Sequence, residues 1–532
     1  MSETREYLGM FARFPRALRR FLERPLTLQV ARQIVQQRME QRAESFLQIA
    51  ARSIYGHPTS PYLALLQHAG CEFGDLQALV KARGLEGALH DLREAGVYVT
   101  FEEFKGRRPI ERNGKAIAVT ARDFDNPYAR RDLTLQTGGS TGLATAVRQD
   151  LDYIAAGAPN TLLGFDAWGM LDVPTVFWHN ILPGAGLRFA LQWAHCGQHI
   201  DRWYSSVGWR DSKYWRRYTP ATLFMVLWMQ ALGARTPMPR NARVERALDI
   251  ARQVRRMLDA EGRCLLHLSA SAALRICTAA GEAGLDLTGA TARVGGEPVT
   301  PAKLEAMERV GLRCMPCYGT IETGTIGFAC LNPVVSDDMH LMHDVFTLIT
   351  HPQEVPASGQ TVQAFNLTSL LDSVPKVMLN YQIDDHGVLE KRHCGCPLEA
   401  LGYGWHVHSV RSYGKLVGES VTLVGNEILA VLEEVLPARF GGSAVDYQLL
   451  EEEDQAGFTR LYLVIDPAVN IPDERAVVET MLQALRASSA AADAARIIWQ
   501  KADTIRVRRE RPTTSSSGKL LPLHVKRVPR HP

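Results

Sequence analysis

The chain has 532 residues, more than one compact core needs and enough for two to four domains. Its 60 Lys+Arg and 57 Asp+Glu give a formal charge of +3, so no charge excess draws it to nucleic acid or to an anionic bilayer. An apolar content of 46% and a charged content of 22% exclude a mostly disordered or fibrous chain.

No apolar stretch reaches the ~18 residues of a membrane span, and residues 1–6 lack a signal-peptide pattern. The nine cysteines look like reduced thiols or metal ligands rather than a secreted disulfide framework. We therefore expect a cytoplasmic enzyme with no transmembrane segment and no nucleic-acid partner.

Residues 1–60 are predicted to be a helical N-terminal extension, because they are rich in Arg, Leu, Phe and Ala and poor in Gly. The arginine-rich stretch from Ala12 to Val35 has two interpretations. It is either a membrane-surface helix or a helix docked on its own domain with its arginine side chains reaching solvent, and we favour the second.

Alternating strand and helix signals up to about residue 385 favour an α/β architecture. Apolar residues on one face predict a helix from Asn241 to Asp259, with Gly262 as its stop. Beyond residue 400, Val445–Leu450, Leu461–Asp466 and Arg496–Gln500 are predicted strands, and Asp473–Ala487 is a predicted helix. These patterns predict a large domain over residues 1–412 and a small α+β domain over residues 413–532.

The loop Thr137-Gly138-Gly139-Ser140-Thr141-Gly142 follows a β-prone run, Leu133–Gln136. Glycines let the backbone turn tightly and point N–H groups inward, and the hydroxyl groups add donors for anionic oxygens. The spacing and the Lys of a Walker A loop are absent. Alone, the loop is compatible with phosphate binding and also with an ordinary turn.

Four further stretches follow the loop. They are Val294-Gly295-Gly296-Glu297-Pro298, Tyr318-Gly319-Thr320-Ile321-Glu322, Tyr381-Gln382-Ile383-Asp384-Asp385 and Thr513-Thr514-Ser515-Ser516-Ser517-Gly518-Lys519. In this order and spacing the chain resembles the adenylate-forming superfamily of acyl-CoA synthetases, peptide-synthetase adenylation domains and luciferases. Within it, the chain is most similar to the phenylacetate–CoA ligase-like branch, from about Pro58 to the end.

The resemblance implies an α/β fold with a large N-terminal adenylate-forming domain and a small α+β C-terminal domain that acts as a mobile lid. Such enzymes use Mg-ATP to convert a carboxylic acid into an acyl-adenylate, and they release pyrophosphate. They then pass the acyl group to a nucleophile, usually the thiol of coenzyme A. We therefore expect an AMP-forming acid–thiol ligase that uses ATP, Mg²⁺ and coenzyme A.

The resemblance also implies a role for each matching residue. Nucleotide binding falls to the pyrophosphate-cradling loop (Thr137, Gly138, Gly139, Ser140, Thr141 and Gly142), to the adenine segment (Gly296, Glu297 and Pro298), to Tyr318 with Gly319 beside the adenine, and to Asp385 at the ribose hydroxyls. Catalysis falls to Glu322, a hard oxygen ligand for Mg²⁺, and to Lys519, whose positive charge reaches the site during adenylation.

The sequence departs from the family pattern in two of the motifs and in the hinge stretch that precedes the small domain. Ile321 replaces a hydroxyl residue, Gln382 replaces an Arg, and the hinge stretch Arg411–Gly418 is shortened and lacks its Asp. Adenylation is therefore better supported than transfer to coenzyme A. The alternatives are transfer to an amine or a carrier protein, or a degenerate non-enzyme that binds nucleotide.

A zinc site is the second prediction. Cys394-Gly395-Cys396 offers two thiolates on a tight turn, and zinc favours tetrahedral Cys/His sets. The residues alone leave the other two ligands open among Cys314, Cys317, Cys330, His340, His343, His393, His406 and His408. The resemblance implies Cys330, His340, Cys394 and Cys396 as a structural zinc site, with Asp344 four residues after the histidine. The rival pair Cys314/Cys317 is expected on one strand, where alternation keeps side chains apart.

The substrate is expected to be a small carboxylic acid, aromatic by analogy. An aromatic-rich stretch runs from Phe165 to Tyr204. We expect a few of its rings to line an acyl pocket and most of them to lie in the core. Four residues are candidates to meet a carboxylate and are not ranked: His179, Arg188, His195 and Arg202. The sequence does not determine whether the acceptor is a thiol or an amine, or whether the protein forms a homodimer.

Overall fold

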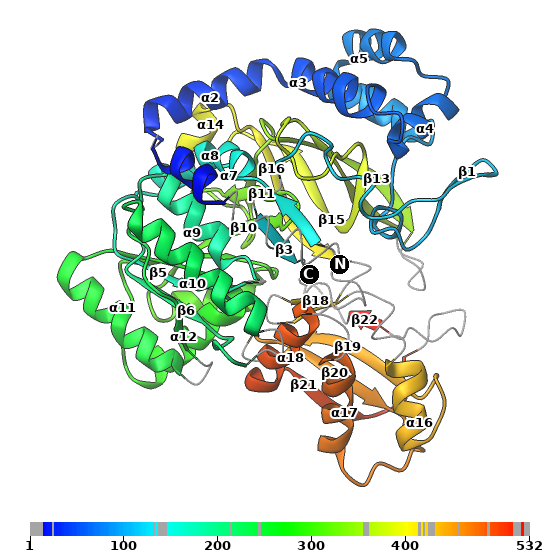
Figure 1. The fold of residues 1–532 in the computed structure, drawn as a ribbon. Coiled ribbons are helices and arrows are strands. Elements are labelled where there is room, and N and C mark those ends of the chain that lie inside the picture. The colour runs from blue at the N-terminus through cyan, green and yellow to red at the C-terminus, as the bar shows by residue number, and fades with distance from the viewer. Residues whose placement is uncertain are drawn as a thin grey trace.

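The computed structural model describes residues 14–23, 26–130, 133–136, 146–182, 184–211, 215–242, 246–354, 361–412, 416–418, 421–423, 431–454, 457–486, 490–513 and 523–525. The chain forms a large unit around a 12-stranded sheet and a smaller unit around a 4-stranded sheet. The small unit lies at one end of the large one (Figure 1). The expected α/β architecture with a smaller C-terminal domain is therefore confirmed.

The large sheet is half parallel and half antiparallel, with the strand order β13-β14-β15-β16-β12-β11-β10-β9-β8-β5-β6-β7. The parallel strands are β5 (Thr175–Trp178), β6 (Arg202–Ser205), β7 (Arg240–Asn241), β8 (Cys264–Ser269), β9 (Ala290–Gly295) and β10 (Arg313–Thr320). The antiparallel strands are β11 (Gly324–Ala329), β12 (Met339–Leu341), β13 (Phe346–Glu354), β14 (Thr361–Ser369), β15 (Tyr381–Lys391) and β16 (Trp405–Ser412).

Helices cover both faces of the parallel half. They are α7 (Leu151–Ala156), α8 (Ala158–Ala167), α9 (Gly186–His195), α10 (Trp215–Ala231), α11 (Ala247–Glu261), α12 (Ala270–Glu282) and α13 (Pro301–Glu308). Strand β5 shows why two layers are needed: Phe177 packs into the cluster with α8, α9 and α10, whereas Val176 and Trp178 pack into the cluster with α11 and α12. Alternate side chains of a strand point to opposite faces, so a strand covered on both sides is apolar throughout.

Helix α11 begins later than the sequence pattern predicted. The pattern gave Asn241 as the first residue, but Asn241 belongs to β7 and the helix starts at Ala247. The stop is confirmed: Gly262 has φ of 71° and its N–H bonds to Leu258 O. Glycine suits this left-handed conformation because it has no Cβ.

The N-terminal region is helical and docked on the large unit. It contains a helix over residues 14–22, then α2 (Leu28–Glu40), α3 (Arg42–Ile49), a π-helix (Ala50–Tyr55), α4 (Pro61–His68), α5 (Phe73–Glu94) and α6 (Phe101–Phe104). Phe14, Leu18 and Val35 are fully buried in the core cluster that contains α8 and α9. The described part of the arginine-rich stretch therefore forms two helices docked on the large unit, which agrees with the favoured interpretation (Figure 1).

Short strands and helices complete the large unit. β1 (Ile110–Arg112) pairs with β2 (Lys115–Ile117), β3 (Leu133–Gln136) pairs with β4 (Ala146–Gln149), and α14 (Pro397–Ala400) precedes β16. The β-prone run before the glycine loop is thus a strand. No helix within the described ranges is long and apolar enough to cross a membrane.

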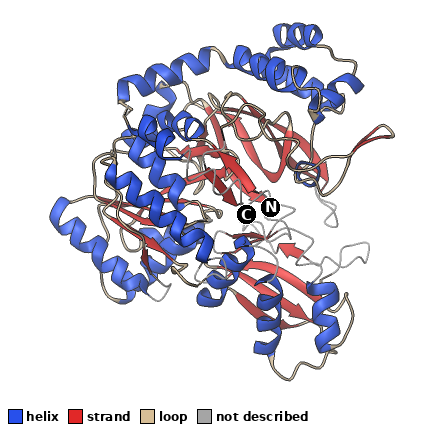
Figure 2. Cartoon of the chain, in the orientation of Figure 1, coloured by secondary structure: helices blue, strands red, loops and turns tan. Residues whose placement is uncertain are grey.

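The small unit follows a hairpin of β17 (Leu416–Gly418) and β18 (Val421–Leu423). Its sheet has the order β21-β20-β19-β22, from β19 (Tyr447–Glu453), β20 (Thr459–Ile465), β21 (Ile505–Arg509) and β22 (Leu523–Val525). Its helices are a π-helix (Val431–Val435), α16 (Leu436–Phe440), α17 (Glu474–Arg486) and α18 (Ala490–Ala502), visible beside the strands in Figure 2.

One prediction in the small unit is wrong. Arg496–Gln500 was expected to be a strand, but it lies within α18, and the strand comes afterwards as β21. Its apolar residues Ile497, Ile498 and Trp499 are all buried in the core of the small unit. A short apolar run is equally compatible with a buried helix and a strand, and here the Ala-rich residues before it extend the helix.

Candidate functional site

Tyr318 and Asp385 come from separate motifs and meet in the structure. Tyr318 lies on β10, and Asp385 lies on β15 opposite Ser412 of β16. Tyr318 Oη donates to Asp385 Oδ2 over 2.8 Å, and Ser412 Oγ donates to Oδ1 over 2.5 Å. Burial, followed by the charge of Asp385, raises the pKa of Tyr318 well above its ordinary value, so the phenol stays a donor. The pair forms a buried acceptor held by two hydroxyl groups.

Glu322 lies in the turn between β10 and β11 and is paired with a lysine. The carboxylate is 7% exposed and forms an ion pair and hydrogen bond with Lys105, which caps the end of α6. Burial pushes the pKa of Glu322 up, but the charge and hydrogen bond of Lys105 outweigh it and the net pKa is lowered. Glu322 is therefore an ionised carboxylate.

Sequence reasoning gave Lys105 no role. It lies 217 residues before Glu322, and only folding brings them together. A basic residue in a loop carries no local signal of such a pairing.

The Gly296-Glu297-Pro298 segment follows β9 and is held in place by hydrogen bonds from buried side chains. The Glu297 side chain is fully buried, accepts from Ser271 Oγ over 2.6 Å and lies 3.7 Å from Lys303 Nζ. Lys303 Nζ also donates to Pro298 O over 3.1 Å. The Glu297 carboxylate thus stabilises the turn.

Two predicted elements lie outside the described residues. These are the whole loop Thr137–Gly142 and Lys519. Strands β3 and β4, which flank the loop, form an antiparallel pair, and Gln149 Nε2 donates to Ile321 O over 2.5 Å. The end of β4 is therefore attached to the turn that carries Glu322.

The predicted zinc ligands converge at one point. Cys330 follows β11, His340 lies on β12, and Cys394 and Cys396 precede α14. His340 Nε2 is 3.0 Å from Cys396 Sγ and 3.7 Å from Cys394 Sγ. A hydrogen bond between Cys330 and Cys396 raises the pKa of the first thiol and lowers that of the second. One imidazole and three sulfurs are a donor set that suits tetrahedral Zn²⁺.

Neighbouring groups orient these donors. His340 Nδ1 bonds to Tyr403 O over 2.7 Å, so Nδ1 carries the proton and Nε2 faces the sulfurs. Glu399 Oε2 accepts from the N–H groups of Cys394 and Gly395, which fixes the turn between the two cysteines. The Asn332 N–H donates to Cys330 Sγ over 3.3 Å. Such contacts are typical of thiolate ligands.

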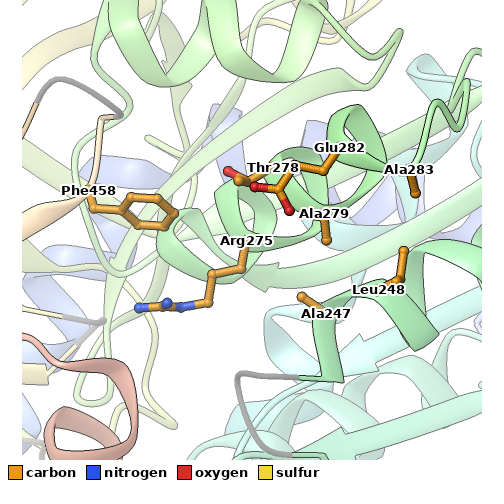
Figure 3. Close-up of a pocket in the computed structure, with 8 residues that line it drawn as sticks. All are labelled: Ala247, Leu248, Arg275, Thr278, Ala279, Glu282, Ala283 and Phe458. Atoms are coloured by element: carbon orange, nitrogen blue, oxygen red, sulfur yellow. The ribbon is translucent and has the colours of Figure 1, made fainter.

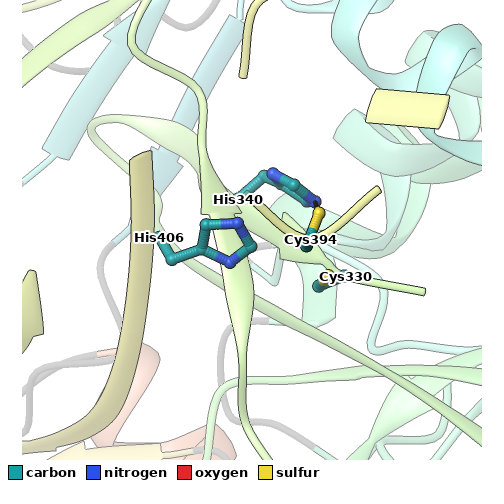
Figure 4. A group of neighbouring side chains, drawn as sticks. All are labelled: Cys330, His340, Cys394 and His406. Atoms are coloured by element: carbon teal, nitrogen blue, oxygen red, sulfur yellow. Dashed lines mark hydrogen bonds between the residues drawn. The ribbon is translucent and has the colours of Figure 1, made fainter. Parts of the chain in front are cut away.

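His406 is a further donor at this cluster. One ligand atom from each of Cys330, His340, Cys394 and His406 lies within 4.8 Å of the others (Figure 4). Sequence reasoning named His406 only among the open alternatives. Its Nδ1 bonds to Asp338 over 2.8 Å, and its buried Nε2 has no hydrogen-bond partner among the described residues. Cys314 and Cys317, on β10, are not part of this group.

The four candidates for a carboxylate partner separate into two pairs. His195 Nδ1 bonds to Phe21 O, and Arg202 donates to Asp201 O. His179 and Arg188 instead lie in a buried cluster around Arg293. The aromatic residues before them, among them Phe165 and Trp203, are core residues.

A separate pocket of about 530 Å³ lies where α11 and α12 approach the small unit (Figure 3). Its lining is formed by Ala247, Leu248, Arg275, Thr278, Ala279, Glu282, Ala283 and Phe458. None of the predicted site residues lines it.

No family model matches the sequence, and no curated protein matches it. Solved structures do match. A 2-hydroxyisobutyryl-CoA ligase in complex with 2-HIB-AMP and CoA superposes with a TM-score of 0.56 at 15% identity, over 91% of this chain and 89% of that chain.

Two further solved structures match with lower TM-scores. A double mutant of o-succinylbenzoate CoA synthetase from Bacillus subtilis has a TM-score of 0.43 at 14% identity, covering 78% of this chain and 72% of that one. The amide bond synthetase McbA from Marinactinospora thermotolerans has 0.42 at 13%, covering 87% and 92%. On the first of these three superpositions, the chain has the fold of the adenylate-forming enzymes.

Proposed function

We propose that the protein activates a carboxylic acid with Mg-ATP. The acid would become an acyl-adenylate with release of pyrophosphate, and the acyl group would then pass to a thiol, coenzyme A first. The single observation that carries this proposal is the meeting of Tyr318 and Asp385 beside the turn of Glu322. These residues come from separate motifs, and the resemblance assigns all of them to one nucleotide site.

Asp385 would accept the ribose hydroxyl groups. An ionised carboxylate is an acceptor with two oxygens, which suits a vicinal diol. Tyr318 and Ser412 hold the carboxylate in place through 2.8 Å and 2.5 Å bonds. The phosphates would lie on the Thr137–Gly142 loop, and Gly296, Pro298 and Gly319 would border the adenine.

Glu322 would give an oxygen to Mg²⁺, which bridges phosphates when bound and neutralises their charge. Its lowered pKa supports this role, because the metal needs the ionised form. Lys105 balances that carboxylate inside the protein. Lys519 would bring a further positive charge to the reacting carboxylate and α-phosphate.

Two finer assignments are part of the proposal. The chain would be an acid–thiol ligase of the phenylacetate–CoA ligase-like branch, with a large domain to residue 412 and a mobile lid after it. Cys330, His340, Cys394 and Cys396 would hold a structural Zn²⁺, because four protein ligands leave no open position for catalysis. Ile321 and the shortened hinge keep an amine or carrier-protein acceptor as the alternative.

Pyrophosphate release from Mg-ATP over a panel of carboxylic acids tests the adenylation step. We expect release with one class of acid, and a fall of about 100-fold or more in Glu322→Gln, which keeps the shape of the side chain and removes its charge. Glu86→Gln is the matched control, because Glu86 also pairs with a basic side chain, that of Arg42, but lies on α5 away from the motifs. Lys519→Ala is expected to abolish release and leave the fold intact.

Two results would contradict the proposal. Equal activity in Glu322→Gln and Glu86→Gln removes Glu322 from the mechanism. Tight ATP binding without release for any acid favours a nucleotide-binding protein that does not turn over. Offering coenzyme A, amines and a carrier protein to the adenylate then identifies the acceptor.

A further inference from the structure

Two arginines are buried together beside the Glu322 turn, and no acidic side chain of the described residues pairs with either. Arg188 on α9 is 6% exposed and Arg293 on β9 is 4% exposed. Within the described residues, neither side chain forms an ion pair with a carboxylate, and the Nε of each has no hydrogen-bond partner. Arginine stays protonated in proteins, so two positive charges are held inside the large unit.

The cluster is attached to the hairpin that carries Glu322. Arg293 Nη2 donates to Thr325 Oγ1 over 3.1 Å. Arg188 Nη2 lies so close to Gly324 that an added Cβ there would be only 2.3 Å from it, so the glycine leaves room for the guanidinium. Gly324 and Thr325 lie two and three residues after Glu322 along the chain. The two charges therefore lie next to the site proposed for adenylation.

Two neutral histidines extend the cluster, and their protons are fixed by the arginine. Arg293 Nη1 donates to His267 Nε2, so His267 carries its proton on Nδ1 and donates to His179 Nε2 over 2.5 Å. His179 must then carry its own proton on Nδ1. Burial, followed by the charge of Arg293, lowers the pKa of His179 to about 3 and that of His267 well below its ordinary value.

The polar groups of this cluster that have no hydrogen-bond partner among the described residues are therefore donors. They are the guanidinium of Arg188, the Nε–H of Arg293 and the Nδ1–H of His179. His179 follows β5, and His267 and Arg293 lie opposite each other on β8 and β9. In an α/β sheet, ligands bind outside the carboxyl ends of neighbouring parallel strands, which is where these side chains are gathered.

Aromatic rings surround the charges but do not compensate them. The Arg293 guanidinium lies 5.8–6.0 Å from the ring centres of Phe165, Phe189 and Phe328. Such contacts offset only part of the cost of desolvating a cation. Burial and the charge of Arg293 together lower the pKa of Arg188, which is the signature of that cost. A bound anion would offset this desolvation cost.

The anion must keep its charge throughout the reaction. When the reacting carboxylate oxygen bonds to the α-phosphorus and the bond to pyrophosphate breaks, that carboxylate becomes an uncharged anhydride. Two arginines paired only with it would be left unpaired again. We propose that the acid carries a second anionic group, a carboxylate in the simplest case, and that Arg188 and Arg293 hold it beside the Glu322 turn. This inference rests on the proposed function.

Matched pairs of acids test it directly. Benzoate is compared with phthalate, isophthalate and terephthalate, and hexanoate with adipate, by calorimetric binding and by pyrophosphate release. We expect one diacid to exceed its monoacid by about 100-fold in affinity and in kcat/KM. Arg188→Met is expected to remove this preference. Arg188→Lys is expected to keep part of it, because a lysine retains the positive charge but cannot form the paired hydrogen bonds of a guanidinium group with a carboxylate.

Arg188 makes no hydrogen bond with another described residue, so Arg188→Met is expected to melt at the wild-type temperature or above it. The Arg188 guanidinium lies 5.8 Å from the centre of the Tyr153 ring. Arg313→Met is the matched control, because this exposed arginine also lies over a ring, 5.0 Å from the centre of Trp168, and its loss is expected to leave the preference unchanged. The diacid should raise the melting temperature of the wild type and not that of Arg188→Met.

The outcomes separate this inference from the proposed function. Diacid binding that Arg188→Met abolishes, without pyrophosphate release, supports the anion site and contradicts adenylation. Release with monoacids at the same efficiency as with diacids supports adenylation and overturns the anion site. A diacid preference that survives in Arg188→Met, or binding of neither acid in any pair, also overturns it.

Discussion

Lys303 offers a sharp test of how the two units are joined. The residue is 1% exposed, and its Nζ donates to Pro298 O and to Thr459 Oγ1, each over 3.1 Å. The carboxylates of Glu297 and Glu453 each lie 3.7 Å away. Thr459 and Glu453 belong to the small unit, so one ammonium group binds both units.

Lys303→Met keeps the length of the side chain and removes its charge. Glu297, whose side chain is fully buried, would then lose the ammonium group 3.7 Å away and keep the hydrogen bond from Ser271 Oγ. Breaking a buried ion pair by removing one partner costs about 3–5 kcal/mol, and we expect a loss of that size in the free energy of unfolding. The double variant Lys303→Met/Glu297→Gln removes both charges, and we expect it to recover at least about 2 kcal/mol over the sum of the two single losses.

Urea unfolding followed by circular dichroism measures these free energies. Lys501→Met is the matched control, because Lys501 also joins the two units, through Asp211 over 2.5 Å, but both side chains are partly exposed. Its loss is expected to cost at most about 1 kcal/mol. A loss below about 1 kcal/mol in Lys303→Met, or additive losses in the double variant, would refute the reasoning.

Three further predictions concern the metal, the core and the pH. Metal analysis should find one zinc per chain, and chelation or Cys394→Ser should lower the melting temperature, since structural zinc contributes folding energy; metal-free wild type would contradict this. Gly164→Ala would place a Cβ 2.5 Å from the Phe328 ring, so a loss of about 1–2 kcal/mol is expected in urea unfolding, and a gain would show that the ring moves freely. Because the folded pKa values of His179 and His267 are lowered, the unfolded chain binds more protons, and stability should fall as the pH drops below 6.5 towards about 3. Urea midpoints between pH 7.5 and 5.5 check this, and His179→Gln should weaken the dependence.

The metal cluster shows what sequence spacing predicts well. The turn Cys394-Gly395-Cys396 has a local signal, and the resemblance supplied Cys330 and His340, which the structure places beside it. His406 had no such signal. It reaches the cluster because β16 pairs with β12, which sets His406 opposite His340.

The charged clusters show where sequence reasoning fails. Lys105 and Glu322 are 217 residues apart, and their ion pair depends on the packing of α6 against β15. Arg293 was not considered, because an arginine inside a buried strand carries no periodic signal. Arg188 was considered, but only the fold shows that it is buried and that no described acidic side chain pairs with it. The helix α18 was missed because a short apolar run fits either structure.

The docked N-terminal helices set a constraint on the order of folding. Arg42 on α3 donates to His343 O and to Thr347 Oγ1, residues 301 and 305 positions later in the chain. Arg38 likewise lies 3.7 Å from the buried carboxylate of Asp344. During synthesis, these early helices, each with one apolar face, leave the ribosome long before their partners exist. The apolar faces of these helices stay exposed until the later strands have been synthesised. We therefore expect the nascent chain to bind chaperones until residue 350 has emerged.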